Sequence, residues 1–484
     1  MRCDPEPTTE EVSETGAFRD GSYFGRGSLR YPDGRRYSGE FRSGQPHGDG
    51  TSVWPDGETH VGAYREGLCH GEGTTRFADG RIYSGPYRDG FFHGQGRMVW
   101  PDGEVYVGEF HAGKATGQGT TTWPSGEEYI GEYLDGIRSG QGTYRFANGS
   151  SYSGEWRAGK PEGKGRLAYL DGRVYFGEFL RGKRHGFGTV IAPDGQEYRG
   201  EYRDDRREGE GSYQWPDGDS YVGGWREGVP HGSGSYRYAS GEEYRGEFRE
   251  GRYHGEGTTR WPDGGYYRGS YRFGEPNGRG DYQSANGSTY QGEWRDGQPD
   301  GQGRYNYADG SSYLGRWRNG KRHGHGTYLF ADGRKYVGEF SEGKYQGQGA
   351  FTFPDGRTYV GSFVDDKYHG QGSYRSPDGE TYVGEFFEGR FHGKGTTTWP
   401  DGRKYFGSYR NNRRDGAGTY IHSDGTIHSG QWRDGLLLDE DRASPSEAAP
   451  VPGSEADMGA SPGVAPVPGS EADTGASPEG DPHV

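Results

Sequence analysis

The chain has 484 residues, of which only 28% are hydrophobic, and its mean hydropathy is −1.14. This composition excludes a large globular core of Leu, Ile and Val, so 39 Tyr, 22 Phe and 11 Trp must supply most of the buried surface. The net charge of −15 lies mainly at the ends: residues 1–20 hold six acids and two Arg (−4), and residues 436–484 hold ten acids and one Arg (−9), which leaves about −2 for 21–435. Such a near-neutral body disfavours nucleic-acid binding.

The sequence carries no signal for a membrane span or for a disulfide framework. No apolar run approaches the roughly 20 residues that a spanning helix needs, and the first residues lack the apolar core of a signal peptide. Cys3 and Cys69 are the two cysteines of the chain. We therefore expect a cytoplasmic protein.

The N-terminal segment leads into a repetitive body. Residues 1–13 are acidic, and we expect them to be disordered. Gly16, Ala17 and Phe18 resemble half of one repeat and are expected to cap the array, so the repetitive domain is predicted to span residues 14–435.

A Tyr-x-Gly-x-aromatic pattern recurs every 23 residues without insertion or deletion, from Tyr37 to Trp432. We number each repeat from its anchor tyrosine as position 0. Of 18 anchors, 16 are Tyr, and the exceptions are His60 and His428. A fixed period of this size indicates a repeat array, in which each unit buries its surface against its neighbours.

Each repeat predicts two strands joined by tight turns. The runs from Tyr106 to Phe110 and from Gln118 to Trp123 alternate with period two and are rich in Thr and aromatic residues. Between repeats stands a turn such as Trp100-Pro101-Asp102-Gly103, which predicts a hairpin whose Gly takes positive φ. The fold class is therefore all-β: an elongated single-layer antiparallel meander of 23-residue hairpins, with essentially no helix.

The connection inside each repeat is expected at the stretch Gly-x-x-His-Gly, for example Gly67–Gly71. With a loop of that length, position 4 would oppose position 13, and position 0 would oppose position 17. In the repeat that begins at Tyr106, Phe110 would then cover Gly119, and Tyr106 would meet Trp123. An aromatic ring that covers a cross-strand Gly stabilises a sheet.

Alternation places the anchors and their aromatic partners on one face, and the other face is expected to be solvated. Twist would bring the rings of adjacent repeats together into an aromatic trough along a narrow ribbon. The candidate partner-binding residues are the aromatic residues of two clear repeats: Tyr106, Phe110, Trp123, Tyr336, Phe340 and Phe353. Gly108→Val or Gly338→Val is expected to disrupt the ribbon locally.

The C-terminal segment 436–484 is acidic and rich in Pro, Ala, Ser and Gly. It contains a duplicated 16-residue segment, at 449–464 and 465–480. Lacking aromatic residues, it is expected to be a disordered tail.

The repeat resembles the MORN (membrane occupation and recognition nexus) repeat. Its signature, Tyr-x-Gly-Glu-(Phe/Trp)-x-x-Gly-x-x-His-Gly-x-Gly, is nearly unbroken from Tyr336 to Gly349 and again from Tyr382 to Gly395. The departures are local, such as Asp205, Asp366 and Asn412 in place of a loop Gly. The resemblance implies an elongated antiparallel sheet and a scaffolding role in cytoskeletal, ciliary or membrane-associated assemblies, with partner helices or self-association in some members.

No pattern in the sequence predicts catalysis, a cofactor site or a metal site. Histidines recur at position 10, but copies one repeat apart would lie roughly 10 Å from each other, whereas zinc ligands lie about 2 Å from one ion. The Gly-x-Gly motifs precede strands, whereas a phosphate-binding loop needs a helix N-terminus. Turn packing is the simpler interpretation of both motifs.

Two functional hypotheses remain. The first is a non-enzymatic scaffold that binds protein partners, or a second copy of itself, along the trough in a cytoskeletal or ciliary assembly. The alternative is a peripheral membrane adaptor that binds anionic phospholipid through the basic loop residues Lys183, Arg184, Lys321 and Arg322.

Overall fold

The computed structural model describes residues 10–19 and 22–438. The described residues form β-strands and turns and contain no helix. Residues 1–9 of the expected N-terminal segment and residues 439–484 of the expected tail lie outside the described residues. Strand β1 begins at Glu10, before the expected start of the array at residue 14. The chain divides between Val229 and Pro230 into two units.

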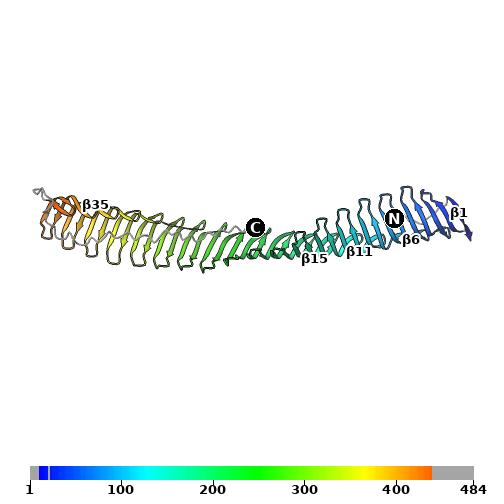
Figure 1. Cartoon of the computed structure of the whole chain (residues 1–484), viewed down its shortest axis with the longest axis horizontal. Coiled ribbons are helices and arrows are strands. Elements are labelled where there is room, and N and C mark those ends of the chain that lie inside the picture. The colour runs from blue at the N-terminus through cyan, green and yellow to red at the C-terminus, as the bar shows by residue number, and fades with distance from the viewer. Residues whose placement is uncertain (1–9, 20–21, 439–484) are drawn as a thin grey trace. The chain divides into compact units, whose positions relative to one another are not determined.

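The first unit is an antiparallel meander in which strands pair with their neighbours in the chain, except that β7 pairs with both the short β8 and β9 (Figure 1). Its strands are β1 (Glu10–Arg19), β2 (Ser22–Arg30), β3 (Arg36–Arg42), β4 (Gln45–Val53), β5 (Thr59–Arg65), β6 (Leu68–Arg76), β7 (Ile82–Arg88), β8 (Phe91–Phe92), β9 (Gly94–Val99), β10 (Val105–His111), β11 (Lys114–Thr122), β12 (Glu128–Leu134), β13 (Ile137–Arg145), β14 (Ser151–Arg157), β15 (Lys160–Ala168), β16 (Val174–Leu180), β17 (Lys183–Ile191), β18 (Glu197–Arg203), β19 (Arg206–Gln214) and β20 (Ser220–Arg226).

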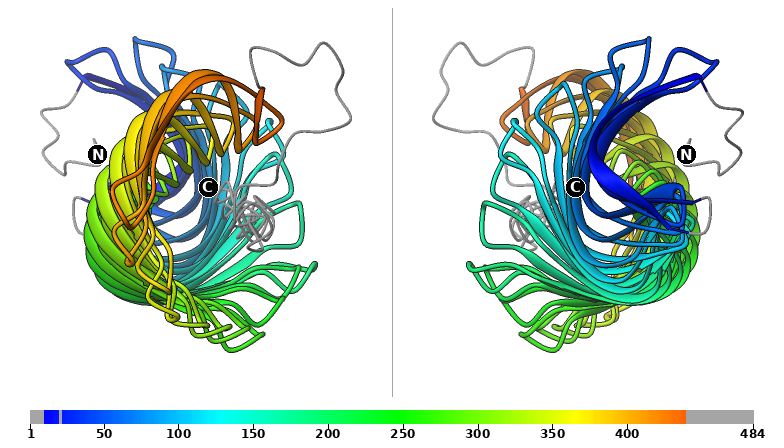
Figure 2. Two further views of the ribbon diagram at one scale, coloured as in Figure 1. Left: turned by 90° about the vertical axis from the view of Figure 1, so that its left-hand side faces the viewer. Right: turned by 90° about the vertical axis from the view of Figure 1, so that its right-hand side faces the viewer.

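The second unit repeats the same arrangement. Its strands are β21 (Val229–Arg237), β22 (Glu243–Arg249), β23 (Arg252–Arg260), β24 (Tyr266–Arg272), β25 (Glu275–Gln283), β26 (Thr289–Arg295), β27 (Gln298–Asn306), β28 (Ser312–Arg318), β29 (Lys321–Leu329), β30 (Lys335–Ser341), β31 (Lys344–Thr352), β32 (Thr358–Val364), β33 (Lys367–Arg375), β34 (Thr381–Phe387), β35 (Arg390–Thr398), β36 (Lys404–Arg410), β37 (Arg413–Ile421), β38 (Ile427–Arg433) and β39 (Leu436–Leu438). Within each unit, successive hairpins are rotated relative to one another, as the end-on views in Figure 2 show.

The turn between repeats is the expected hairpin with a glycine bulge. In the copy at Trp54, the Gly57 N–H donates to the Trp54 carbonyl at 3.0 Å, and the Trp54 N–H donates to the Glu58 carbonyl at 2.9 Å. Gly57 has φ 87°, which is strained for residues with a Cβ. The Pro-Asp-Gly sequence therefore fixes this connection, as predicted.

The turn inside each repeat is shorter than the sequence analysis expected. In the hairpin of β10 and β11, His111 pairs with Lys114, so the loop is Ala112-Gly113 alone, and both residues have positive φ (47° and 84°). These dihedrals match a type I′ turn. The expected Gly-x-x-His-Gly loop is wrong, because its last four residues belong to the second strand.

The cross-strand register also differs from the expectation, by two residues at positions 0 and 2 and by four residues at position 4. Gly108 pairs with Gly119, Tyr106 with Thr121, and Phe110 with Ala115. The expected contacts of Phe110 with Gly119 and of Tyr106 with Trp123 are therefore wrong. A bulge between Gly108 and Phe110 absorbs the extra residues of the second strand.

The glutamate at position 3 stabilises this bulge. The Glu132 carboxylate accepts from the Gln141 N–H at 3.1 Å, and Glu339 accepts from the Gln348 N–H at 3.2 Å. The same carboxylates lie over the glycines at position 11, Gly140 and Gly347, both of which have positive φ. The Glu and Gly of the signature thus belong to one local structure.

The anchor tyrosine lies flat over two glycines. A Cβ on Gly119 would lie 2.5 Å from the Tyr106 ring, and one on Gly108 would lie 2.5 Å from the Gly119 Cα. The Tyr106 hydroxyl donates to the Glu109 carbonyl at 2.9 Å. The ring that covers the cross-strand glycine is therefore the anchor, rather than the aromatic residue at position 4.

Candidate binding face

One face of each unit, here called the aromatic face, carries positions 0, 4, 9, 15 and 17. The Tyr106 ring meets Phe110 of its own repeat edge-on at 5.1 Å and Tyr133 of the next repeat at 5.0 Å. Tyr336 makes the same contacts with Phe340 and Phe363. Each such pair contributes about 0.5–1.5 kcal/mol beyond its area. Rings of adjacent repeats therefore bury one another, as the trough hypothesis expected.

The candidate partner-binding residues all lie on this face, but most are buried. Tyr106, Phe110, Tyr336, Phe340 and Phe353 are each at most 7% exposed, and Trp123 is half-buried. Their role in partner binding stays a proposal.

A partner on the aromatic face would mainly touch side chains that the sequence analysis did not single out. These are half-buried or exposed residues at positions 9, 15, 17 and 21, such as Trp100, Phe146 and Glu104. Period-two alternation along the second strand could have pointed to these residues, but only together with the observed cross-strand register.

A hollow of about 530 Å³ lies on the aromatic face of the first unit. Phe77, Met98, Trp100 and Tyr133 line it, and Tyr106 and Phe110 lie beneath. It exists because position 9 of this repeat is the small Ala115, whereas Phe92 and Arg138 stand at position 9 of the repeats on either side. Charged groups such as Glu58, Arg81 and Glu104 share the lining with these rings, so the hollow suits an amphipathic side chain of a partner.

Elsewhere on the face, an arginine at position 9 fills the same place. The Arg138 guanidinium lies 4.8–5.9 Å from the ring centres of Trp123, Tyr129, Tyr144 and Trp156. Burial raises the pKa of Glu104, two repeats earlier, while the Trp123 indole and the Arg138 charge oppose that rise. An aromatic enclosure therefore holds this cation, and the Glu104 carboxylate lies near enough for the two charges to attract.

The edge that carries the type I′ turns is lined with ion pairs between adjacent repeats. A basic residue at position 8 meets an acid at position 6 of the next repeat, as in Lys114–Asp135 at 3.2 Å and Lys344–Asp365 at 3.0 Å. These side chains are more than half exposed, so each pair contributes little to stability.

Of the candidate lipid-contact residues, Lys183 and Lys321 stand at position 8 on this edge, and Arg184 and Arg322 stand at position 9 beside it. Lys321 pairs with Glu342 at 2.9 Å and Lys183 with Asp204 at 3.9 Å. Arg184 pairs with Asp205 at 3.2 Å and lies over the Tyr202 ring. The Arg322 side chain is buried over Tyr328 and donates to the Gly343 carbonyl at 2.8 Å. All four cations therefore have partners within the chain.

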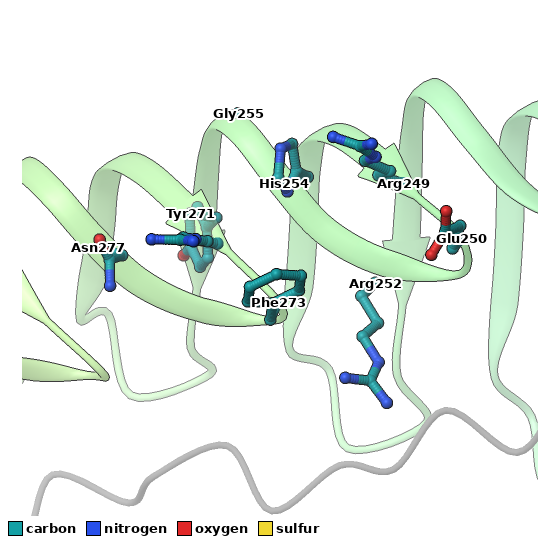
Figure 3. A pocket seen from close by; sticks show the side chains of 9 residues that line it. Arg249, Glu250, Arg252, His254, Gly255, Tyr271, Phe273 and Asn277 are labelled. Atoms are coloured by element: carbon teal, nitrogen blue, oxygen red, sulfur yellow. The ribbon is translucent and has the colours of Figure 1, made fainter.

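Figure 3 shows a second hollow, at the turns of β22–β23 and β24–β25 in the second unit. Arg249, Arg252, His254 and Phe273 line it. The figure shows the labelled side chains spread along the turns, with Arg249 and Arg252 directed away from each other. Because these groups do not converge on one point, the hollow has the features of a loop surface rather than of a binding site.

The opposite face is exposed to solvent, as expected, but it is not uniformly polar. Position 1 carries large apolar side chains in five successive repeats of the second unit, each 43–57% exposed: Leu314, Val337, Val360, Val383 and Phe406. Except for His93, the position-10 histidines lie in the second strands, as His185 and His392 do. In residues 10–19 and 22–438, no group of three His, Cys, Asp or Glu side chains is arranged to hold a metal ion. No helix among the same residues is long and apolar enough to cross a membrane.

The comparisons identify the repeat. The MORN repeat family model matches 18 segments, from residues 15–35 to residues 405–427. The chain belongs to the MORN-repeat family. The matching model describes a repeat and not a catalytic domain. No curated protein matches the sequence.

Several solved structures match parts of this MORN-repeat chain at low similarity. The SAS-4 (dCPAP) TCP domain of Drosophila melanogaster, in complex with a proline-rich motif of Ana2, is 14% identical over 40% of this chain and 97% of that chain, with a TM-score of 0.22. The Danio rerio CPAP TCP10 domain with a STIL peptide is 15% identical over 55% of this chain and 92% of that chain, with a TM-score of 0.13. Virginiamycin B lyase from Staphylococcus aureus is 12% identical over 55% of this chain and 83% of that chain, with a TM-score of 0.11. These scores are too low to support any functional argument.

Proposed function

We propose that this MORN-repeat protein is a non-enzymatic scaffold that binds protein partners along its aromatic face. The observation that carries the proposal is the half-exposed aromatic surface above the buried anchors, with the hollow at Ala115 as one defined place on it. An exposed apolar surface with scattered polar groups typically marks an interaction site. The expected occupant is a helical or extended segment of another protein, or a second copy of this chain.

The setting that the family resemblance implies is a cytoplasmic cytoskeletal assembly, such as a cilium or flagellum. The side chains support a protein partner over an anionic membrane, because Lys183, Arg184, Lys321 and Arg322 already have partners within the chain. Each basic residue offers only about 1 kcal/mol at a membrane surface.

The test uses a matched pair of exposed phenylalanines in the first unit. Phe146 is 37% exposed on the aromatic face, where it contacts Tyr144, and Phe176 is 47% exposed at position 1 on the opposite face. The full-length wild type, Phe146→Glu and Phe176→Glu would each be expressed in the native cell as proximity-labelling fusions. The proposal expects Phe146→Glu to lose a set of labelled proteins that Phe176→Glu retains. The proposal fails if both variants label the wild-type set, or if only Phe176→Glu loses it.

A further inference from the structure

The Arg138 enclosure has a counterpart 138 residues later in the chain. Trp261, Tyr267, Tyr282 and Trp294 occupy the repeat positions of Trp123, Tyr129, Tyr144 and Trp156, with the same residue type at each position. The ring spacings agree as well: Trp123–Tyr144 and Tyr144–Trp156 are 5.7 and 6.1 Å apart, and Trp261–Tyr282 and Tyr282–Trp294 are 6.0 and 6.1 Å apart.

The cation of the first enclosure has no equivalent in the second. Position 9 is Arg138 in the first copy and Pro276 in the second. Pro276 keeps the strand register, because it pairs with Tyr271 as Arg138 pairs with Tyr133. The strand register is therefore the same in both copies, although the rings of the second copy meet at 70° and 68° rather than at 44° and 43°.

The carboxylate that faced the cation is retained. Glu242 stands at the repeat position of Glu104, and its Oε1 is buried without a hydrogen-bond partner in the structure. Burial raises the pKa of Glu242, and no opposing charge lowers it. Glu104 differs in this respect, because Arg138 opposes the effect of burial there. A buried acceptor without a donor costs about 1–3 kcal/mol, which a partner could recover.

Two other repeats show how the chain satisfies a glutamate at this position. Glu380 interacts with Arg414, which stands at position 9 two repeats later. Glu127 interacts with the Tyr144 hydroxyl of the next repeat and accepts from Ser125 at 2.9 Å. For Glu242, Pro276 stands at the position of Arg414, and Thr259 stands at the position of Tyr144. The Thr259 hydroxyl is already hydrogen-bonded to the Tyr271 hydroxyl at 2.7 Å.

The edge beside Pro276 adds further negative charge. Position 8 is usually basic and pairs with an acid of the next repeat, but here it is Glu275, beside Asp296. Burial raises the pKa of Glu275, and the Asp296 charge raises it further. Arg252 and Arg272 stand at the neighbouring turn and at this one, so these two acids add a local negative charge beside Pro276 rather than a net negative charge along the edge.

We propose that Trp261, Tyr282, Trp294 and Glu242 form a binding site for an arginine side chain of a basic protein segment. The guanidinium would lie against the rings, as Arg138 does in its own enclosure, and would donate to the Glu242 carboxylate. The site rests on the proposed function, because the segment would come from a protein bound to the aromatic face.

The test measures binding of a fluorescent tri-arginine peptide to the full-length chain at about 0.3 M salt, where diffuse attraction to exposed acids is screened. The matched control ligand is tri-citrulline, which keeps the shape but removes the charge. Tri-lysine distinguishes a guanidinium site from general cation binding. We expect saturable binding of tri-arginine, at least tenfold weaker binding of tri-citrulline, and weaker binding of tri-lysine.

Three variants locate the site. Pro276→Arg supplies the chain's own cation, and Glu242→Gln removes the charge, so each is expected to weaken tri-arginine binding at least tenfold. Pro299→Arg is the matched control, because the repeat position of Glu242 is Gly265 there and that of Trp261 is Ser284. It is expected to leave the affinity within twofold of wild type.

A second measurement needs no ligand. Pro276→Arg is expected to raise the melting midpoint of the wild-type chain but not that of the Glu242→Gln chain, which also shows that the variants fold. The proposal is overturned if wild type fails to bind tri-arginine saturably, or if Pro276→Arg and Glu242→Gln bind it as wild type does. Equal binding of all three peptides, or equal weakening by Pro299→Arg, overturns it too. None of these results bears on whether Phe146→Glu loses natural partners, so the two proposals fail separately.

Discussion

At the residue scale, the anchor position decides how each repeat is packed. Sixteen anchors are tyrosines that are at most 2% exposed, and their hydroxyls donate to the carbonyl at position 3, as in Tyr37 to Glu40 at 2.8 Å. His60 is the buried exception, with Nδ1 2.9 Å from the Thr75 hydroxyl and Nε2 without a hydrogen-bond partner. A shorter, titratable ring therefore replaces a neutral one inside the array.

His60 is expected to make the stability of the first unit dependent on pH. Burial lowers its pKa to about 4, whereas the unfolded residue titrates near 6.5. The unfolded state therefore binds more protons between these values. The stability is complete above about pH 6.5 and falls by about 3 kcal/mol as the pH drops to 4.

The variant His60→Tyr isolates this effect. The melting midpoint of His60→Tyr is expected to exceed that of wild type by a margin that grows from pH 7 to pH 5. A constant margin over that range would show that His60 is not buried in its neutral form.

At the element scale, the type I′ turn links neighbouring repeats. The position-7 N–H donates to the position-9 carbonyl of the previous repeat, as in Gly67 to Pro46 at 3.0 Å. Where Asn412 replaces glycine, its Oδ1 also accepts from the Phe391 N–H at 2.7 Å. Asp366 accepts from the Tyr345 N–H in the same way. These departures from the signature therefore add a second link between repeats.

Asn412 has two roles: its side chain accepts a hydrogen bond, and its backbone adopts a positive φ of 72°. Substitutions at this position should separate the two roles. Asn412→Ala keeps neither the acceptor nor the tolerance of positive φ, and is expected to cost about 2–3 kcal/mol. Asn412→Asp keeps both and should stay near wild type, and Asn412→Gly should fall between them. The measurement is the melting midpoint of each full-length variant. Equal midpoints for the Ala and Asp variants would rule out this role for the side chain.

Much of each element could be predicted from the sequence, for reasons that particular residues show. Pro101-Asp102-Gly103 has one compatible turn, and period-two alternation placed Tyr106 and Phe110 on one face. The internal turn was missed because glycines recur at both ends of Gly-x-x-His-Gly, although x-Gly at positions 6 and 7 is a strong hairpin signal. The shorter turn moved every expected cross-strand pair by four residues, and the bulge at position 3 moved the pairs of Gly108 and Tyr106 back by two.

The accessible residues of the candidate site were harder to predict than the fold. Tyr106 and Tyr336 recur because they hold the sheet together, so repetition pointed to buried rings. The features that distinguish one stretch of the face from another are single departures, such as Ala115 and Pro276. Their meaning depends on neighbours two repeats away, which only the register reveals.

At the scale of the whole molecule, each repeat packs only against its neighbours within a unit. Stability in such an array is approximately a sum of repeat terms and nearest-neighbour terms. A local defect should therefore stay local.

Gly338→Val tests this locality. A Cβ on Gly338 would lie 2.5 Å from the Tyr336 hydroxyl and 2.6 Å from the Gly349 Cα, and a valine adds more bulk. We expect faster amide exchange in β28 to β33 and unchanged exchange in β2 to β19. Val337→Ala, at a neighbouring exposed position, is the control and should change little. Uniform acceleration through both units would contradict nearest-neighbour packing.

The central claim is that the aromatic face buries its own anchors, one repeat against the next, without a second layer. Burial raises the pKa of the anchor tyrosines, including Tyr106, Tyr244 and Tyr336, above the usual range. The most direct test is an ultraviolet titration of the folded full-length chain from pH 9 to 11.5. The account predicts that the sixteen anchors stay protonated while exposed tyrosines ionise, and that all 39 titrate near pH 10 in guanidinium. Ionisation of all 39 near pH 10 in the folded chain would contradict it.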